Sequence, residues 1–270
     1  MTYDHHSDRL SYSKLKVLAD DPRLFYDSFV ARTYNRQPSE RMNLGSLLHA
    51  ILLQPSELSQ FATMPDGMRR GTKAYHDWRA KFDPGVIEVT EREYNQAVDM
   101  VQAIIRHPIA GKYFAGRRVL ETPVYGQLHG LEFQCKPDLL HFDHRCIVDL
   151  KTTRSLDDRS IKWAIKDYAY DLQIATYLGL AQLDEWRWIF VVVGDRPQIR
   201  VVKPTSDTIA SGEAFLARLC GEYKSRMQSG DWRSLYEIEE SEIEFIRSDE
   251  DETVVTCNID VACDLSDARF

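Results

Sequence analysis

The stretch Cys135-Lys136-Pro137-Asp138, followed by Val148-Asp149-Leu150-Lys151-Thr152-Thr153, decides the fold of this chain. Apolar and polar residues alternate over 131–135, and an apolar strand resumes at 146–148 after a turn. Alternate residues of a strand point to the same face, so Asp149 and Lys151 share one face and Asp138 lies on the neighbouring strand. The pattern predicts that two carboxylates and one ammonium group converge at one place.

These groups are suited to the hydrolysis of phosphodiesters. Carboxylate oxygens are hard ligands of the kind that Mg²⁺ prefers, and a nearby ammonium group stabilises negative charge on a phosphate. The alternative is that an Asp after Pro is a turn residue and that Asp-Leu-Lys is an exposed strand edge. The sequence has no Gly-x-x-x-x-Gly-Lys loop and no convincing Ser-His-Asp or Cys-His arrangement, so ATP hydrolysis and covalent catalysis are not expected.

Two further patterns place polar side chains on helices. His49 lies in the segment 44–53, which is apolar almost all round and is therefore expected to be a buried helix. Gln173 and Tyr177 are four residues apart and share one face of a helix. The alternatives are a core histidine bonded to a backbone carbonyl, and ordinary helix packing for Gln173 and Tyr177.

The ordered motifs resemble those of the RecB-like branch of the PDDEXK nuclease superfamily. They are Gly45-x-x-x-His49, Pro137-Asp138, Asp149-x-Lys151-Thr152 and Gln173-x-x-x-Tyr177. Within that branch the chain most resembles the nuclease domain of RecE-type exodeoxyribonucleases (exodeoxyribonuclease VIII-like), through Leu10-Ser-Tyr-Ser-Lys-Leu15, Asp21-Pro22, Tyr26 and Tyr168-Ala-Tyr170. The resemblance covers most of residues 10–230.

The resemblance implies a set of metal ligands. His49, Asp138 and Asp149 would bind a divalent metal, helped by the backbone carbonyl of Leu150. Glu121, on the strand before the expected hairpin, is a further candidate ligand or a neighbour of the ligands. The second acid is Asp where the superfamily's name has Glu, and RecB-like members commonly use Asp there. One or two Mg²⁺ ions are expected, with Mn²⁺ as a substitute.

The remaining motif residues would act on the substrate. Lys151 would orient or activate the attacking water, and Gln173 and Tyr177 would line the wall that binds the phosphate. Catalytic roles are thus expected for Lys151, Asp138, Asp149, Gln173 and Tyr177.

The resemblance also implies an activity and partners. We expect a processive 5′-to-3′ exonuclease that degrades one strand of linear double-stranded DNA in phage-type recombination. Such nucleases form rings on DNA and work with a single-strand annealing recombinase, so double-stranded DNA ends, a homo-oligomer and such a recombinase are the expected partners. Two alternatives stay open: a structure-specific or sequence-specific endonuclease on the same core, and a non-catalytic DNA-binding accessory protein of recombination.

Composition agrees with a single enzyme domain. The 270 residues are 43% hydrophobic, and we expect one nuclease domain over 1–236, with a helical part at 1–115 and a catalytic core at 116–236. No apolar run could span a membrane, so a soluble protein is expected in the cytoplasm of a bacterial or phage-infected cell. The five cysteines include no Cys-x-x-Cys pair, which favours reduced thiols. They also lack the spacing by which some RecB-like relatives hold an iron–sulfur cluster, so no cluster is expected.

The net charge of −8 comes from the C-terminal end. Residues 237–270 carry a net charge of −10, so residues 1–236 carry +2. Basic residues of the body are candidates for contacts to the DNA backbone, although each could also be an exposed surface cation. The candidates are Arg69, Arg70, Lys73, Arg117, Arg118, Arg154, Arg159, Lys162 and Lys166. Lys162 and Lys166 are favoured, because they follow the Asp-x-Lys strand.

The acidic extension 237–270 has two interpretations. It is either a disordered segment that competes with DNA or recruits a partner, or a β-hairpin built from 243–246 and 254–259. Its β-branched residues favour the hairpin.

The periodicity predicts an α/β (α+β) fold with a mixed central β-sheet flanked by helices, which fits the PDDEXK core that the resemblance implies. The first third should be helical, with a polar loop at 64–73. Helices are expected at 11–30 with a break at Pro22, 44–53, 91–105, 161–182 with a break near Tyr168, and 206–228. Strands are expected at 119–128, 131–142 and 146–152, forming a three-stranded meander, and at 187–193 and 198–202.

Overall fold

The computed structural model describes residues 7–34, 43–193 and 196–234. The chain up to Ser234 belongs to one compact unit. The hairpin expected in the extension 237–270 lies outside the described residues. Within the described ranges, no helix combines the length and the apolar character needed to cross a membrane.

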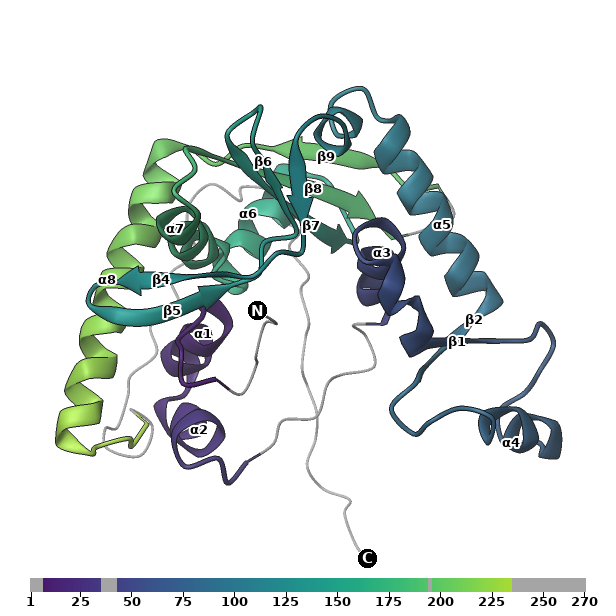
Figure 1. The fold of residues 1–270 in the computed structure, drawn as a ribbon, viewed down its shortest axis with the longest axis horizontal. Coiled ribbons are helices and arrows are strands. Elements are labelled where there is room, and N and C mark those ends of the chain that lie inside the picture. The colour runs from purple at the N-terminus through teal and green to yellow at the C-terminus, as the bar shows by residue number, and fades with distance from the viewer. Residues whose placement is uncertain (1–6, 35–42, 194–195, 235–270) are drawn as a thin grey trace, which may run out of the picture. The chain divides into compact units, whose positions relative to one another are not determined.

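A five-stranded mixed sheet forms the centre of this unit (Figure 1). In spatial order its strands are β3 (Arg118–Leu120), β6 (Leu139–His141), β7 (Cys146–Thr153), β8 (Glu185–Val192) and β9 (Ile199–Val202). Strands β7 and β8 are parallel, and the other neighbours are antiparallel. A parallel pair needs a crossover connection, which is supplied here by α6 (Asp158–Asp167) and α7 (Tyr170–Ala181). The expected mixed sheet flanked by helices is confirmed.

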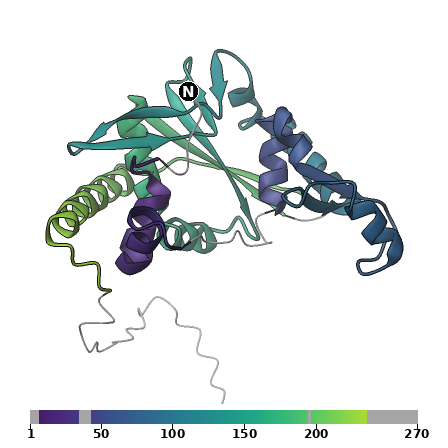
Figure 2. The same ribbon diagram turned by 60° about the horizontal axis from the view of Figure 1, so that its bottom comes forward.

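Different helices cover the two faces of the sheet. Val148 and Leu150 pack with α3 (Asn43–Leu52) and α5 (Glu91–Arg106), whereas Ile147 packs with α6 and α7. Figure 1 shows α3 and α5 on one side of the sheet and α7 on the other, and the turned view of Figure 2 keeps the blue α5 apart from the yellow-green C-terminal helix. Because side chains alternate along a strand, Asp149 projects toward α7.

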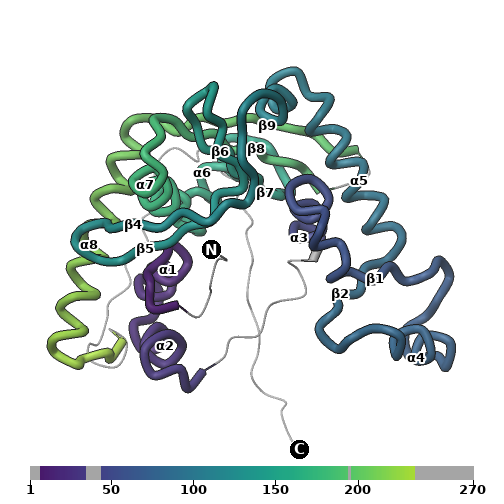
Figure 3. The backbone as a smooth tube through the Cα atoms, in the orientation of Figure 1, coloured from purple at the N-terminus to yellow at the C-terminus, as the bar shows by residue number. Residues whose placement is uncertain are grey.

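The N-terminal helices pack against the C-terminal one. Ser11 caps α1 (Tyr12–Asp20), and Asp21 caps α2 (Pro22–Phe25), so the chain breaks at Pro22 as predicted. A π-helical turn, Tyr26–Val30, follows. Helices α1 and α2 lie beside α8 (Ser206–Ser229), as the tube of Figure 3 shows. Leu15 and Leu18 of α1 and Phe25 of α2 share one core with α7 and α8.

The expected three-stranded meander is wrong in one respect. Its distal part, β4 (Val124–Leu128) and β5 (Leu131–Cys135), forms a separate two-stranded sheet. The strands expected at 119–128 and 131–142 are both interrupted. The first breaks at Glu121, which has a φ of 47°, and the second at Pro137, which has no N–H to donate. The backbone N–H of Glu121 donates to the carbonyl of Asp138 at the break. The interruption therefore brings two acidic residues to the same place.

The N-terminal third is not helical throughout, contrary to the prediction. Strands β1 (Phe61–Met64) and β2 (Ile87–Thr90) form a parallel pair, with α4 (Lys73–Arg79) between them in the sequence. Short 3₁₀ helices occupy Pro55–Gln60 and Gly111–Phe114. Helix α5 follows β2 directly and begins with a capping box between Thr90 and Glu93.

Candidate metal centre

Three side chains from three elements meet beside β7. His49 comes from α3, Glu121 follows β3, and Asp138 precedes β6. One ligand atom of each lies within 4.8 Å of the others. Nδ1 of His49 is 3.3 Å from Oε1 of Glu121, and its Nε2 is 3.7 Å from Oδ2 of Asp138. The imidazole is thus held between two carboxylates rather than by a backbone carbonyl.

The carboxylates control the charge of His49. Burial alone would lower its pKa, but the charges of Asp138 and Glu121 outweigh burial, and the pKa rises to about 9. The ring therefore carries a proton at neutral pH when no metal is bound. A metal ligand must be neutral imidazole, so a cation at this place would displace that proton.

Glu121 is held in its ionised form. Its side chain is 6% exposed, and Nζ of Lys136 lies 2.9 Å from its Oε2. Burial acts to raise the pKa of Glu121, but hydrogen bonds to His49 and Lys136 prevail and lower it. Lys136 also reaches Oε1 of Gln54 at 3.3 Å. Lys136 is thus a neighbour of the centre, although the motifs assign it no role.

Asp138 is fixed by the backbone of β7. The N–H of Leu150 donates to its Oδ2 at 2.7 Å. Burial raises the pKa of Asp138 to about 7 and the charge of Asp149 adds to this, whereas His49 and Lys151 oppose it. An additional positive charge would therefore favour the ionised form of Asp138. The carbonyl of Leu150 as a metal ligand stays a prediction.

Asp149 forms a second group with Lys151 and Gln173. Asp149 is 1% exposed, its Oδ1 accepts from Nε2 of Gln173 at 2.8 Å, and its Oδ2 lies 2.5 Å from Nζ of Lys151. Nζ of Lys151 also lies 4.7 Å from the ring centroid of Tyr170. Burial alone would lower the pKa of Lys151, but Asp149 raises it above the ordinary value. Lys151 therefore remains an ammonium ion.

The donor set fits a divalent cation. Two carboxylates and one imidazole, from His49, Glu121 and Asp138, form the cluster that could hold a metal among the described residues. Beside Asp149, the buried Oε1 of Gln173 has no hydrogen-bond donor within the described chain. Asp149 is not one of these three residues, and Gln173 and Lys151 contact its two oxygens. Its role as a metal ligand stays a prediction.

Tyr177 lies one turn after Gln173 on α7. Its ring packs edge-on against Trp186, with centroids 5.8 Å apart, and belongs to the hydrophobic core. A role of Tyr177 in binding phosphate stays a prediction. Tyr12, which no motif assigned to the site, donates its hydroxyl to the carbonyl of Tyr168, and burial raises its pKa.

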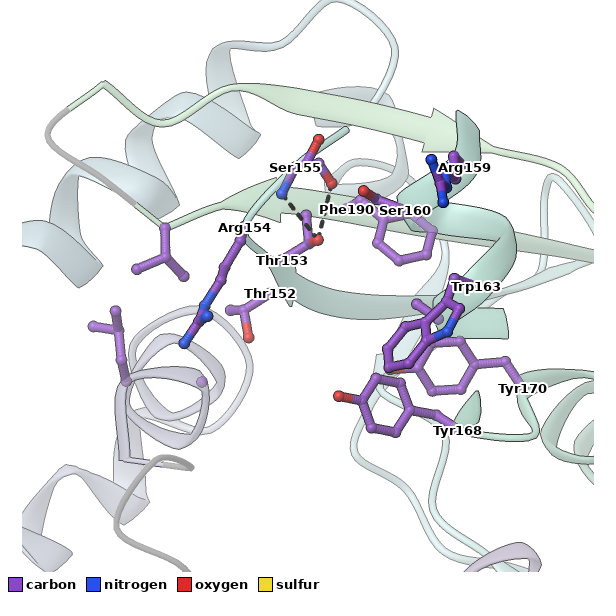
Figure 4. A pocket seen from close by; sticks show the side chains of 14 residues that line it. Thr152, Thr153, Arg154, Ser155, Arg159, Ser160, Trp163, Tyr168, Tyr170 and Phe190 are labelled. Atoms are coloured by element: carbon purple, nitrogen blue, oxygen red, sulfur yellow. Dashed lines mark hydrogen bonds between the residues drawn. The ribbon is translucent and has the colours of Figure 1, made fainter. Parts of the chain in front are cut away.

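A pocket of about 940 Å³ opens beside the centre (Figure 4). Gly45 and Thr152 line it on the side of α3 and β7, Tyr170 lines it on the opposite side, and Arg154 and Arg159 also line it. The other cations predicted to contact DNA lie elsewhere. Lys162 and Lys166 are exposed on α6, Arg69 is exposed in the loop before α4, and Arg70 lies 3.6 Å from Glu88.

Comparison with known proteins identifies the fold. Residues 11–193 match a family described as PDDEXK-like domain of unknown function (DUF3799). No curated protein matches the chain. The crystal structure of a provisionally assigned exonuclease from Eubacterium rectale is similar, with a TM-score of 0.60 and 17% identity, over 85% of this chain and 88% of that one. A phage-related exonuclease from Haemophilus somnus has a TM-score of 0.38 and 12% identity, over 80% and 83% of the two chains.

At these identities the first similarity shows a shared fold, and the second is too weak to carry an argument. The family match covers the elements that supply His49, Glu121, Asp138, Asp149 and Lys151. PDDEXK nucleases generally use divalent metal ions, in agreement with the donor set found here. The chain therefore belongs to the PDDEXK-like family DUF3799.

Proposed function

We propose that the protein is a Mg²⁺-dependent exodeoxyribonuclease, for which Mn²⁺ can replace Mg²⁺. The observation that carries this proposal is the cluster of His49, Glu121 and Asp138 next to the ion pair of Asp149 and Lys151. A divalent ion held by the cluster would lower the pKa of a bound water and stabilise charge on the phosphate. The second acid, Asp149, would join the ligands if it moved away from Lys151.

The protein's own groups prepare the site. Lys151 presents a positive charge where negative charge develops on the phosphate. Asp149 and the ring of Tyr170 fix the position of that ammonium group. Gln173 in turn holds Asp149 through its amide N–H. Lys136 balances Glu121, so that a buried carboxylate is available without a proton.

The resemblance of the motifs to those of RecE-type nucleases supports a proposal for the mode of cleavage. We infer processive 5′-to-3′ degradation of linear double-stranded DNA, by a ring-shaped homo-oligomer that works with a single-strand annealing recombinase. The motifs that support this assignment all occur in the expected order, from Leu10 to Tyr177. Arg154, Lys162 and Lys166 follow β7 and are available for contacts to the DNA backbone, with Arg69 and Arg70 as further candidates.

Digestion of matched linear and covalently closed duplex DNA tests this function. The 5′ and 3′ ends of the linear form carry different labels, and each reaction is run with Mg²⁺, with Mn²⁺ and with a chelator. The proposal requires that only the linear form is degraded, that the ion is needed, and that the 5′ label is released first. Asp138→Asn serves as the inactive control, since Asn has a similar shape but no charge.

The other outcomes point to the alternatives. Cutting of closed circles would indicate an endonuclease on the same core. Binding of DNA without cleavage in either ion would indicate a non-catalytic accessory protein.

A further inference from the structure

An exposed aromatic wall lines the pocket beside the metal centre. The side chains of Trp163 and Tyr168 are 61% and 45% exposed, although large aromatic residues are usually mostly buried. Trp163 lies on α6, and Tyr168 lies in the turn between α6 and α7. Figure 4 shows both rings gathered with Tyr170 on one side of the pocket. Neither ring is needed to fill the core.

The wall is continuous with the proposed catalytic lysine. The rings of Trp163 and Tyr168 have centroids 6.4 Å apart at 83°, and those of Tyr168 and Tyr170 are 5.6 Å apart at 32°. The ring of Tyr170 in turn lies 4.7 Å from Nζ of Lys151. The three rings thus lead from Lys151 along the pocket, and a ligand that stacks on Tyr168 would be separated from Lys151 by the ring of Tyr170 alone.

Cations accompany the aromatic wall. Arg154 lies across the pocket from the rings in Figure 4. Nζ of Lys16 lies 5.0 Å from the ring centroid of Tyr168. The pocket therefore combines flat apolar faces with positive charge, which is the chemistry that binds single-stranded nucleic acid.

The pocket is also large enough for a nucleotide. Its volume of about 940 Å³ lies within the usual range of ligand pockets, roughly 300–1,000 Å³. Within a duplex both faces of each base are covered by its neighbours, and at a duplex end only the outer face of the last pair is free. A single base that enters the pocket between the rings and Arg154 must therefore leave its partner.

We propose that the pocket lined by Trp163, Tyr168 and Arg154 binds the unpaired base and phosphate of the nucleotide next to the scissile bond. The substrate strand would then enter the site as single-stranded DNA, and a paired end would have to open before cleavage. This proposal rests on the proposed nuclease function and names the form of DNA that the site takes. It makes Trp163 a specificity-determining residue.

A binding experiment tests the stacking independently of cleavage. The probe is a single-stranded oligonucleotide with 2-aminopurine at its end, whose fluorescence is quenched when the base stacks, and the protein carries Asp138→Asn to prevent cleavage. Adding Trp163→Ala should raise the Kd roughly tenfold and remove the quenching, in line with alanine substitutions at stacking aromatics. Trp163→Phe should keep most of the affinity and most of the quenching. The matched control is Phe142→Ala, which removes another exposed aromatic side chain, outside the pocket.

A cleavage experiment tests the consequence for the substrate. The same labelled strand is presented as a blunt duplex and as a duplex with a splayed end of several unpaired nucleotides. The wild-type protein should cut the splayed end faster, and Trp163→Ala should reduce this preference, whereas Phe142→Ala should not.

The two proposals fail in different ways. If the wild-type protein cuts no DNA with either ion, the nuclease function fails, and the quenching experiment still decides whether the pocket binds a base. If the protein cuts DNA but Trp163→Ala leaves the Kd, the quenching and the preference for splayed ends unchanged, the base-binding pocket is wrong.

Discussion

The side-chain amide of Gln173 donates to Oδ1 of Asp149 across 2.8 Å, and both side chains are buried. This contact joins helix α7 to strand β7 beside the ion pair of Asp149 and Lys151. The orientation of the Gln173 amide is determined, since its oxygen would repel the carboxylate of Asp149. The bond therefore serves both the stability of the core and the position of Asp149.

Loss of this amide should affect stability and activity together. Gln173→Met keeps the volume but leaves Asp149 with one donor fewer, and an unsatisfied buried group costs about 1–3 kcal/mol. Urea unfolding should show a decrease of that size in the free energy of unfolding, and the cleavage rate should fall as well. Thr176→Val is the control, because the Thr176 hydroxyl bonds within its own helix, to the carbonyl of Leu172. Equal rates for Gln173→Met and the wild type would contradict the positioning role.

The ion pair of Lys151 and Asp149 should show strong coupling. Removing one partner of a buried pair leaves an uncompensated charge and costs roughly 3–5 kcal/mol when fully buried, so we expect slightly less here, where Lys151 is 18% exposed. Lys151→Met and Asp149→Asn should each destabilise the protein, and the double variant should lose less stability than the two single losses combined. All three should lose DNA cleavage. Additive effects in a urea-unfolding cycle would show that the pair is not coupled.

The relative positions of several predicted site residues could be derived from the sequence. The spacing of Asp149 and Lys151 predicted a shared face of one strand, and the structure shows their ion pair there. The apolar pattern around His49 predicted a buried helix, and α3 covers one face of the sheet. These features depend on local periodicity, which a single sequence carries.

Other features could not be predicted from local patterns. The positive φ of Glu121, which turns its side chain toward His49, results from the tertiary break between β3 and β4. Strands β1 and β2 have four residues each, which is too short for a clear alternation of apolar and polar residues. Helix α4 also separates them in the sequence. The position of the Asp149 carboxylate depends on Gln173, which lies 24 residues further along the chain.

The crossing of α7 and α8 should be sensitive to a single methyl group. A Cβ on Gly212 would lie 2.1 Å from the carbonyl oxygen of Asp171, which is backbone and cannot rotate away. Gly212→Ala should therefore destabilise the protein by about 1–3 kcal/mol and displace the helix that carries Gln173. Gly221→Ala, on the same helix with open space around it, should instead stabilise by up to about 1 kcal/mol. Thermal unfolding of both variants measures the difference, and similar melting temperatures would refute the close crossing.

His141 should make the fold sensitive to mild acid. It is buried, and its Nε2 donates to the carbonyl of Ala115 while its Nδ1 accepts from the N–H of His144. Burial lowers the pKa of His141 and His144 acts in the same direction, although the hydrogen bond to Ala115 and the charge of Asp143 oppose them.

The sign of the effect follows from this lowered pKa. As the pH falls through the ordinary histidine value of about 6.5, the unfolded chain takes up a proton before the folded one does. The stability that neutral His141 contributes is thus fully present above that pH and decreases below it. Urea unfolding at about pH 7.5 and about pH 5.5 should show the loss, and His141→Gln should reduce it. The exposed His76→Gln is the control, and an identical pH dependence in both variants would argue against the role of His141.

We propose that His49, Glu121 and Asp138 hold the divalent ion with which the protein cleaves DNA. The most direct test is a calorimetric titration of the metal-free protein with Mn²⁺, alongside cleavage of linear duplex DNA by the same samples. We predict that the wild type binds Mn²⁺ and cleaves only with the ion. Asp138→Asn should lose binding and lower cleavage by roughly 100-fold or more, whereas the exposed Asp99→Asn on α5 should behave as the wild type. Cleavage in the presence of a chelator, or unchanged Mn²⁺ binding by Asp138→Asn, would contradict the claim.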